Sequence, residues 1–320
     1  MDTRFPIGAR GIKVVALGGG HGLYASLSAL KLITRNITAI VTVADDGGSS
    51  GRLRKELGGL PPGDLRMALS ALCDDSEWGQ TWRDVLQYRF ESQGELNGHA
   101  LGNLLIEGLW DLLGDTVNGL DWVGNLLDVR GRVIPMAAVP LEIEADVADR
   151  DRGITTIYGQ NKVAKSHALI RNIRIEPSDP PVHQEALDAV RDADWVIFGP
   201  GSWFTSVIPH LLVPRLRTAL STTKAKKLLV LNLESDGETA LLDAAAHVLS
   251  FHECAPQLSL TTVLADPDAV ENWELLHSAA ALCGADVMAH PVADVAARGH
   301  HDPLYLAAAY RRAFLEVAPA

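Results

Sequence analysis

The N-terminal part of the chain alternates between continuous apolar runs and a helical pattern. Residues 12–17 form a short apolar run that stops at three consecutive glycines. Between residues 23 and 33, leucine and isoleucine recur every three or four positions, and residues 37–43 form a second, β-branched run. This order predicts a strand, a glycine turn, a helix and a second strand, and two strands joined in this way normally pair in parallel.

The same alternation returns in the second half of the chain. The predicted strands are residues 195–198, 228–233 and 258–264, and the predicted helices are residues 183–191, 206–220, 238–251, 268–282 and 303–316. Helical patterns also cover residues 64–72, 80–90 and 99–113. We therefore predict an α/β fold with a Rossmann-like, doubly wound, mainly parallel sheet that carries helices on both faces.

The middle of the chain has a different pattern. Residues 133–139, 141–147 and 154–158 are short β-rich runs separated by turn residues, which predicts a meander or hairpin. A proline-rich segment at residues 177–181 leads back to the helical pattern. We predict a single domain over residues 1–320, with an irregular β-containing insert at about residues 130–180.

Composition and charge exclude several classes of protein. The 320 residues carry a formal net charge of −12, so a nucleic acid is a poor candidate partner. No apolar stretch approaches the length of about 18 residues that a membrane span needs, and the N-terminus lacks a signal-peptide pattern. The three cysteines are scattered and form no CxxC pair, which is typical of a reduced, cytoplasmic protein. A homodimer is the expected assembly.

The first candidate site is the glycine-rich loop after the first predicted strand. It consists of Gly18, Gly19, Gly20, His21 and Gly22, and it opens a helix. Glycines at this point bring backbone N–H groups close to a phosphate at the positive end of the helix. The spacing is not that of the G-x-G-x-x-G dinucleotide motif, and a tight turn without a ligand is the alternative.

The second candidate is a pair of adjacent carboxylates, Asp45 and Asp46, at the carboxyl end of the second predicted strand. Open α/β sheets bind their ligands at this edge. The pair could accept ribose hydroxyls, hold a hydrated Mg²⁺ or act as a base. The alternative is a solvated loop in which one carboxylate caps a helix that starts near Ser49 or Ser50.

A third acidic position follows a Pro-Pro-Gly turn. Asp64 is placed to cap the next helix, which can be its whole role. The alternative is that Asp64 faces Asp45 or Asp46 across a shared metal, so Asp46 and Asp64 are the candidate ligands of an Mg²⁺ ion. No cofactor is established by these residues alone.

Two further polar residues open an apolar helix. His99 lies at its N-terminus, where the helix dipole keeps an imidazole neutral and able to donate to a phosphate or carbonyl, and Asn103 lies one turn later. An isolated histidine is more often structural, so neither residue is assigned a catalytic role.

The second half of the sheet repeats the glycine-loop pattern. Small and hydroxyl-bearing residues lie between a strand and a helix, namely Gly199, Pro200, Gly201, Ser202, Thr205 and Ser206. Asn232 ends the next strand at the same expected edge. Two such loops in one sheet indicate a phosphate-binding crevice. Near the C-terminus, His300, His301 and Asp302 could ligate a metal, but Asp302 before Pro303 is better interpreted as a helix cap.

These motifs together resemble one family. The segments VVALGGGHGL, ITAIVTVADDGGSSGRLRKELGGLPPGDLR, GHALGNLL, VRGRVIP and FGPGSWFTSVIPHLLV occur in the order and spacing of the YvcK-type, gluconeogenesis-factor-like proteins, which are relatives of 2-phospho-L-lactate transferase. The resemblance covers about residues 12–240, with a weaker tail to about 305. It implies a Rossmann-like fold that binds UDP-N-acetylglucosamine or UDP-glucose and coordinates carbon metabolism with cell-wall growth and cell shape.

The transferase branch of this family implies a second function. Those enzymes use Mg²⁺ and acidic residues to move a phospholactyl group from a guanosine diphosphate donor to a deazaflavin hydroxyl, and the acidic positions would fall on Asp45 or Asp46 and on Asp64. The sequence departs from the family where His21 replaces a hydroxyl residue and where His300 replaces an arginine. The second change implies weaker ligand binding or binding at lower pH.

The leading hypothesis is therefore a nucleotide-sugar-binding regulatory protein, and the rival is an Mg²⁺-dependent transferase. A nicotinamide oxidoreductase ranks last because the glycine spacing does not fit.

Overall fold

A computed structural model of the chain describes residues 11–149, 153–235, 237–297 and 299–316. Its centre is a seven-stranded sheet with the order β10-β9-β8-β7-β1-β2-β3, in which every neighbouring pair is parallel. The strands are β1 (Val14–Gly18), β2 (Ile37–Val41), β3 (Arg132–Pro135), β7 (Trp195–Phe198), β8 (Lys226–Val230), β9 (Thr262–Ala265) and β10 (Asp286–Ala289). The predicted Rossmann-like α/β fold is thus confirmed.

The sheet is wound in two directions from its middle. The chain runs outward from β1 to β2 and β3, then returns to β7 on the other side of β1 and continues to β10. Val14 of β1 therefore pairs with Ile37 of β2 on one side and with Trp195 of β7 on the other. The switch point lies between β1 and β7, where sheets of this topology have their ligand crevice.

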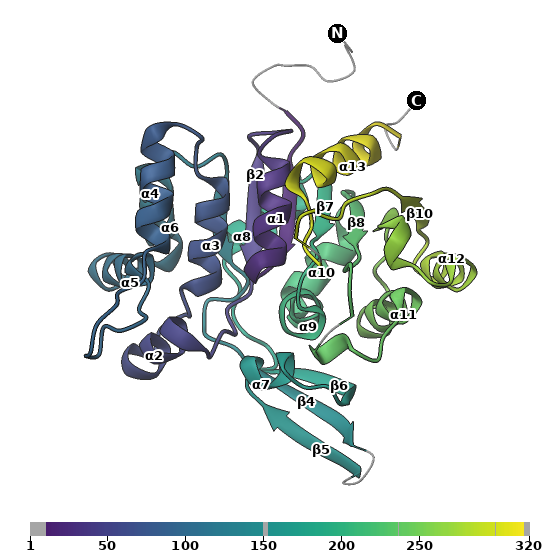
Figure 1. The fold of residues 1–320 in the computed structure, drawn as a ribbon, viewed down its shortest axis with the longest axis horizontal. Helices are drawn as coiled ribbons and strands as arrows, with labels where there is room; N and C mark the ends of the chain where they lie inside the picture. The colour runs from purple at the N-terminus through teal and green to yellow at the C-terminus, as the bar shows by residue number, and fades with distance from the viewer. Residues whose placement is uncertain (1–10, 150–152, 236, 298, 317–320) are drawn as a thin grey trace.

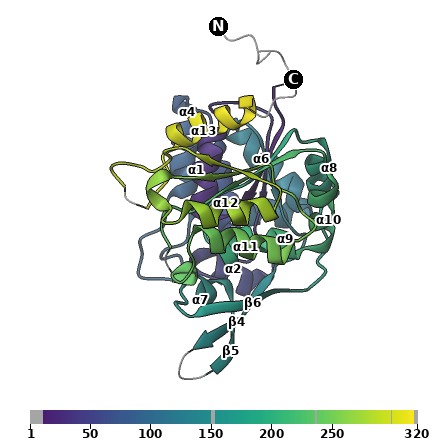
Figure 2. The same cartoon turned by 90° about the vertical axis from the view of Figure 1, so that its right-hand side faces the viewer.

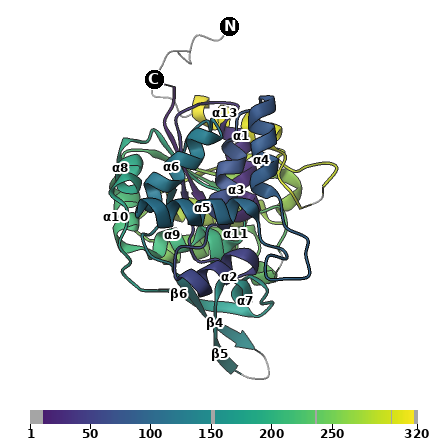
Figure 3. The same cartoon turned by 90° about the vertical axis from the view of Figure 1, so that its left-hand side faces the viewer.

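Helices cover both faces of the sheet (Figures 2 and 3). On one face, α1 (Gly20–Leu30) packs between α3 (Gly63–Leu72) and α13 (Pro303–Glu316), and a buried hydrogen bond of 2.8 Å joins Ser26 to Tyr310. On the other face, α8 (Gln184–Asp192) packs against α10 (Pro214–Thr222). Both faces of β1 are buried, which explains its continuous apolar run.

The remaining helices extend these layers (Figure 1). They are α2 (Gly48–Leu57), α4 (Glu77–Gln87), α5 (Leu101–Leu113), α6 (Thr116–Leu126), α7 (Gln160–Ala164), α9 (Pro209–Leu212), α11 (Ala244–Cys254) and α12 (Trp273–Leu282). A π-helical turn forms η1 (Trp203–Val207), and short 3₁₀ helices form η2 (Gly237–Thr239) and η3 (Pro267–Ala269). Among the described residues, no helix has both the length and the apolar composition that crossing a membrane requires.

The insert is a small antiparallel sheet beyond the carboxyl edge of the main one (Figure 1). Its order is β5-β4-β6, with strands β4 (Glu142–Asp149), β5 (Gly153–Tyr158) and β6 (Leu169–Glu176). The backbone N–H of Leu141 donates to the carbonyl of Val43 at 3.0 Å, which anchors the start of the insert to the loop after β2.

Several predicted elements differ from those observed. Residues 133–139 were expected in the insert, but residues 132–135 form edge strand β3 of the main sheet, where Pro135 at the strand end is tolerated. The strands β6 and β10 and helix α6 were not predicted. The helix expected at 206–220 is divided into three pieces, because Pro209 and Pro214 cannot donate the N–H groups that a continuous helix needs.

Candidate functional site

The two glycine-rich loops meet at the switch point of the sheet. A Cβ atom at Gly22, in the first turn of α1, would overlap the carbonyl oxygen of Pro200 and lie 2.6 Å from Cα of Gly201. Gly201 has φ of +129°, a conformation that favours glycine. The loops after β1 and β7 therefore contact each other directly through their backbones.

The first loop lies against a carboxylate from α3. Gly19 precedes α1 in an extended conformation and offers no side-chain cap, and the backbone N–H of Gly20 donates to Asp64. A Cβ atom at Gly19 would lie 2.5 Å from Oδ2 of Asp64 and would overlap Thr42. Thr42, which lies beside Gly19, is buried and was not predicted as a site residue from the sequence.

Asp64 does not cap its own helix. The residue before α3 is Pro62, and Asp64 lies in the first turn with its carboxyl group directed at Gly20 instead. Burial and the nearby Asp45 carboxylate raise the pKa of Asp64 to about 7, while the Gly20 N–H and the Arg66 guanidinium act in the opposite direction. Asp64 therefore changes its charge near neutral pH.

Asp45, rather than Asp46, is the aspartate whose charge raises the pKa of Asp64. One oxygen of Asp45 accepts from the N–H of Gly47 at 2.9 Å, and the other lies beside Gly63, the residue before Asp64. Asp46 turns outward and accepts from the N–H of Asn161 in the insert at 2.9 Å. The expected pairing of Asp46 with Asp64 is therefore not the arrangement in the structure, because Asp46 is bonded to the insert instead.

Asp45 and Asp64 could supply two oxygen ligands to a metal. Among the described residues, no group of three or more histidine, cysteine, aspartate or glutamate side chains is arranged to hold a metal ion. Two carboxylates nevertheless suit Mg²⁺, which often completes its shell with water and the phosphates of a bound ligand.

The second loop is held in place by Asn232. Its side chain accepts from the N–H of Gly201 and donates to the carbonyl of Gly201, both at 2.8 Å. Both polar ends of the amide are therefore bonded to the loop, and Asn232 acts as a positioning residue.

A buried glutamate covers the helical turn that follows this loop. Oε1 of Glu238 accepts from the N–H of Phe204 at 2.9 Å and from the hydroxyl of Thr205 at 3.3 Å. Burial raises the pKa of Glu238 to about 7, against the effect of these donors. The N–H groups that were predicted to bind phosphate near Thr205 are thus already paired with a protein carboxyl group, and the sequence analysis assigned Glu238 no role.

His99 and Asn103 belong to a buried network at the start of α5. His99 Nδ1 lies 3.0 Å from the hydroxyl of Ser49, and Asn103 donates to the same hydroxyl at 3.0 Å while accepting from Arg66 at 2.8 Å. Burial and the neighbouring Arg52 lower the pKa of His99. These contacts brace α2 against α5, and neither His99 nor Asn103 lines the cavity between the glycine loops.

That cavity has a volume of about 440 Å³. Its lining joins the first turn of α1, the second loop, the end of β8 and the segment before α13, through His21, Gly22, Gly201, Ser202, Trp203, Asn232, Glu234, Glu238, His300 and His301, among others. No lysine or arginine is among the described residues that line it. Attraction for an anion must therefore come mainly from backbone N–H groups and from histidine.

His301 does not supply positive charge to the cavity. Its Nε2 lies 3.2 Å from the carbonyl of Leu231, and burial lowers the pKa of His301 to about 4. The next residue, Asp302, accepts from the N–H groups of Leu304 and Tyr305 at 2.7 and 3.0 Å. The interpretation of Asp302 as the cap of the last helix is thus confirmed.

Replacing Asn232 with alanine is expected to release the second loop. The change leaves the N–H and the carbonyl of Gly201 without their partner, so the free energy of unfolding should fall by about 2 kcal/mol. Urea denaturation measures this loss. The exposed Asn125 on α6 is the matched control, and an equal loss in Asn125→Ala would contradict the assigned role.

A parallel sheet with glycine loops on both sides of its switch point defines the Rossmann-like class of α/β proteins. Residues 14–299 match the family described as 2-phospho-L-lactate transferase CofD, and the chain belongs to this family. The resemblance stated from the motifs is thereby confirmed.

Relatives and solved structures agree with this assignment. The chain is 50% identical over 305 residues to a protein of Mycobacterium leprae, covering 92% of this chain and 84% of the relative. It is 42% identical over 232 residues to the gluconeogenesis factor of Halalkalibacterium halodurans, covering 71% and 70%. The crystal structure of protein BH3568 from Bacillus halodurans superposes with a TM-score of 0.84 at 31% identity, covering 94% of this chain and 99% of that one.

Proposed function

We propose that this protein binds a nucleotide sugar, UDP-N-acetylglucosamine or UDP-glucose, in the cavity between the two glycine loops. The observation that carries the proposal is the direct contact of the loops at Gly22 and Pro200, at the switch point of a parallel sheet. The gluconeogenesis-factor relatives support a regulatory role in carbon metabolism, which we extend to cell-wall synthesis and cell shape in the cytoplasm.

The chemistry of the cavity supports a diphosphate at the start of α1. This helix has 11 residues, and its N-cap residue, Gly19, has no side chain. Asp64 accepts from the N–H of Gly20, but His21 and Gly22 in the same turn line the cavity. The helix dipole and backbone N–H groups attract an anion at this position without a lysine or arginine. Asp45 lies in the loop after the neighbouring strand β2 and is not among the residues that line the cavity. Its carboxylate can accept hydrogen bonds from the ribose hydroxyls of a ligand that extends past the first loop.

One observation favours an Mg²⁺-dependent transferase as the second candidate. Asp45 is close enough to raise the pKa of Asp64, which lies beside the first loop, and two carboxylates can hold Mg²⁺ against the phosphates of a nucleotide donor. The metal would neutralise the charge that develops on the leaving phosphate.

Calorimetric titration tests the two functions. We expect UDP-N-acetylglucosamine or UDP-glucose to bind with and without Mg²⁺, and Asp45→Asn to weaken binding about 10–100-fold because a charged hydrogen-bond acceptor is lost. Asp111→Asn, an exposed change on α5, is the control and should bind as the native protein does. Strict dependence on Mg²⁺ with a preference for GDP would favour the transferase, and no binding of any nucleotide to folded protein would reject both.

A further inference from the structure

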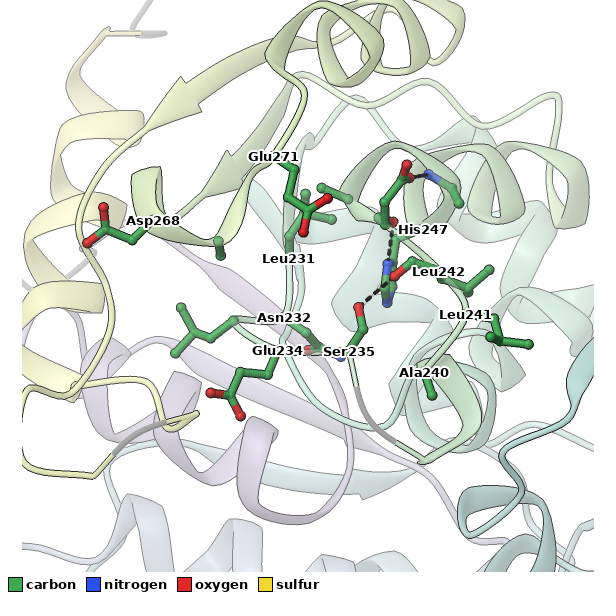
Figure 4. Close-up of a pocket in the computed structure, with 15 residues that line it drawn as sticks. Leu231, Asn232, Glu234, Ser235, Ala240, Leu241, Leu242, His247, Asp268 and Glu271 are labelled. Atoms are coloured by element: carbon green, nitrogen blue, oxygen red, sulfur yellow. Dashed lines mark hydrogen bonds between the residues drawn. The ribbon is translucent and has the colours of Figure 1, made fainter.

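A second and larger cavity adjoins the first at the carboxyl ends of β8 and β9 (Figure 4). Its volume is about 970 Å³, and it shares Asn232, Leu233 and Glu234 with the cavity between the glycine loops. The two cavities are therefore neighbours along one edge of the sheet.

The larger cavity is lined by His247, whose ring has an unusual hydrogen-bond arrangement. The side chain of His247 is almost fully buried, at 3% exposure. Nδ1 lies 2.8 Å from the carbonyl oxygen of Asp243, and a carbonyl only accepts, so Nδ1 must carry the hydrogen. Burial lowers the pKa of His247, which keeps the ring neutral. Nε2 is therefore an acceptor with a free lone pair.

That lone pair has no partner within the part of the chain that the structure describes. Nε2 of His247 is a buried atom without a hydrogen bond. The nearby indole N–H of Trp203 does not serve it, because Trp203 donates to Ser250 at 2.7 Å and only packs edge-on against the His247 ring. A buried acceptor left unpaired costs about 1–3 kcal/mol, a cost that a ligand with a donor group could remove.

The charged residues of the described lining are all acidic, and most of the others are leucine and alanine. The carboxylates of Glu234, Asp268 and Glu271 line the cavity, and the hydroxyl of Ser235 already donates its hydrogen to the carbonyl of Leu242 at 2.6 Å (Figure 4). Such a lining repels the diphosphate of a nucleotide. It suits a neutral group with many donors, such as the hydroxyls of a sugar.

We propose that the larger cavity is the subsite for the sugar, in which Nε2 of His247 accepts a hydrogen bond from a sugar hydroxyl or amide. This proposal rests on the proposed function, since it places the sugar beyond a diphosphate held at the glycine loops. Nε2 is shielded from solvent in this structure, so the sugar must displace neighbouring side chains of the lining to reach it.

The test compares UDP with UDP-N-acetylglucosamine and UDP-glucose by calorimetry. His247→Leu fills the same space without an acceptor, so we expect unchanged affinity for UDP and about 10-fold weaker binding of the sugar-bearing ligand. The matched control is His252→Leu on the same helix. Nδ1 of His252 is also buried and unpaired among the described residues, but His252 does not line the cavity, so this variant should bind both ligands as the native protein does.

Native protein labelled with ¹⁵N in histidine gives a second readout that does not depend on a variant folding. The Nε2 resonance of His247 should shift on addition of the UDP-sugar and not on addition of UDP. Two results would overturn the subsite and leave the proposed function intact. One is an unchanged ratio of the affinities for UDP and the UDP-sugar in His247→Leu, and the other is an Nε2 resonance that does not shift when the UDP-sugar is added. If the native protein binds neither ligand, the proposed function fails and the subsite fails with it.

Discussion

Gly22→Ala is expected to weaken nucleotide binding at least about 100-fold and to lower the free energy of unfolding by about 3 kcal/mol. Alanine is normally the better residue inside a helix, so helix propensity alone predicts a gain. Here the added methyl group would overlap the carbonyl oxygen of Pro200. The second loop cannot retreat easily, because Asn232 bonds to both backbone groups of Gly201. The two loops must therefore separate.

The control for this change is Gly108→Ala in α5. A Cβ atom at Gly108 meets nothing within 4 Å, so this variant should gain about 0.5–1 kcal/mol and retain native affinity. Urea denaturation and calorimetry on both variants measure the two effects. Native affinity in Gly22→Ala would show that the loop contact does not form the ligand site.

Glu238→Gln is expected to make the protein more stable than the native form at alkaline pH. The pKa of Glu238 is raised from 4.5 to about 7 by burial, so the folded state favours the neutral carboxyl group. Its contribution to stability is complete below about pH 4.5 and is lost as the pH rises through about 7. Glutamine stays neutral and keeps an oxygen for the N–H of Phe204. The advantage of the variant should grow from near zero at pH 4.5 to about 3 kcal/mol at pH 8.

Urea denaturation at pH 5, 6.5 and 8 checks this dependence. Glu91→Gln removes an exposed carboxylate from a loop and is the control, which should change the free energy of unfolding by no more than about 0.5 kcal/mol. If the free energy of unfolding of Glu238→Gln differed from that of the native protein by the same amount at every pH, Glu238 would not be held in its neutral form.

Because Glu238 also lines the smaller cavity, its neutral form should favour an anionic ligand. We therefore expect nucleotide binding to tighten below pH 7 in the native protein more than in Glu238→Gln.

The glycine loops were predictable because their requirement is local. A strand followed by Gly18, Gly19 and Gly20 and then a helical pattern has few possible conformations, and the topology of parallel sheets brings such a loop to one edge. The same holds for Asp302, whose cap involves only its immediate neighbours. The insert was less predictable, since β3 and β4 are both short β-rich runs and only pairing decides which sheet each one joins.

The carboxyl groups of the site could not be assigned from spacing. Asp64 looked like a helix cap, and its partner, Gly20, is far away in the sequence. Asp45 and Asp46 are adjacent, and only the position of the insert decides that Asp46 bonds to Asn161. Glu238 is found only when the loop after β8 is seen lying against Phe204. In each case the partner is brought close by the tertiary structure, and the hydrophobic pattern of the sequence does not predict it.

The position of β1 in the sheet order has a consequence for biosynthesis. Val14 needs both Ile37 and Trp195 as neighbours, so β1 can complete only one of its two ladders until residue 195 has been translated. At about 5–20 residues per second, this leaves an apolar strand edge open for roughly 10–30 seconds on the ribosome. Unpaired strand edges promote association between chains, so slow or interrupted translation of the middle segment should reduce the yield of native protein more than a pause after β7.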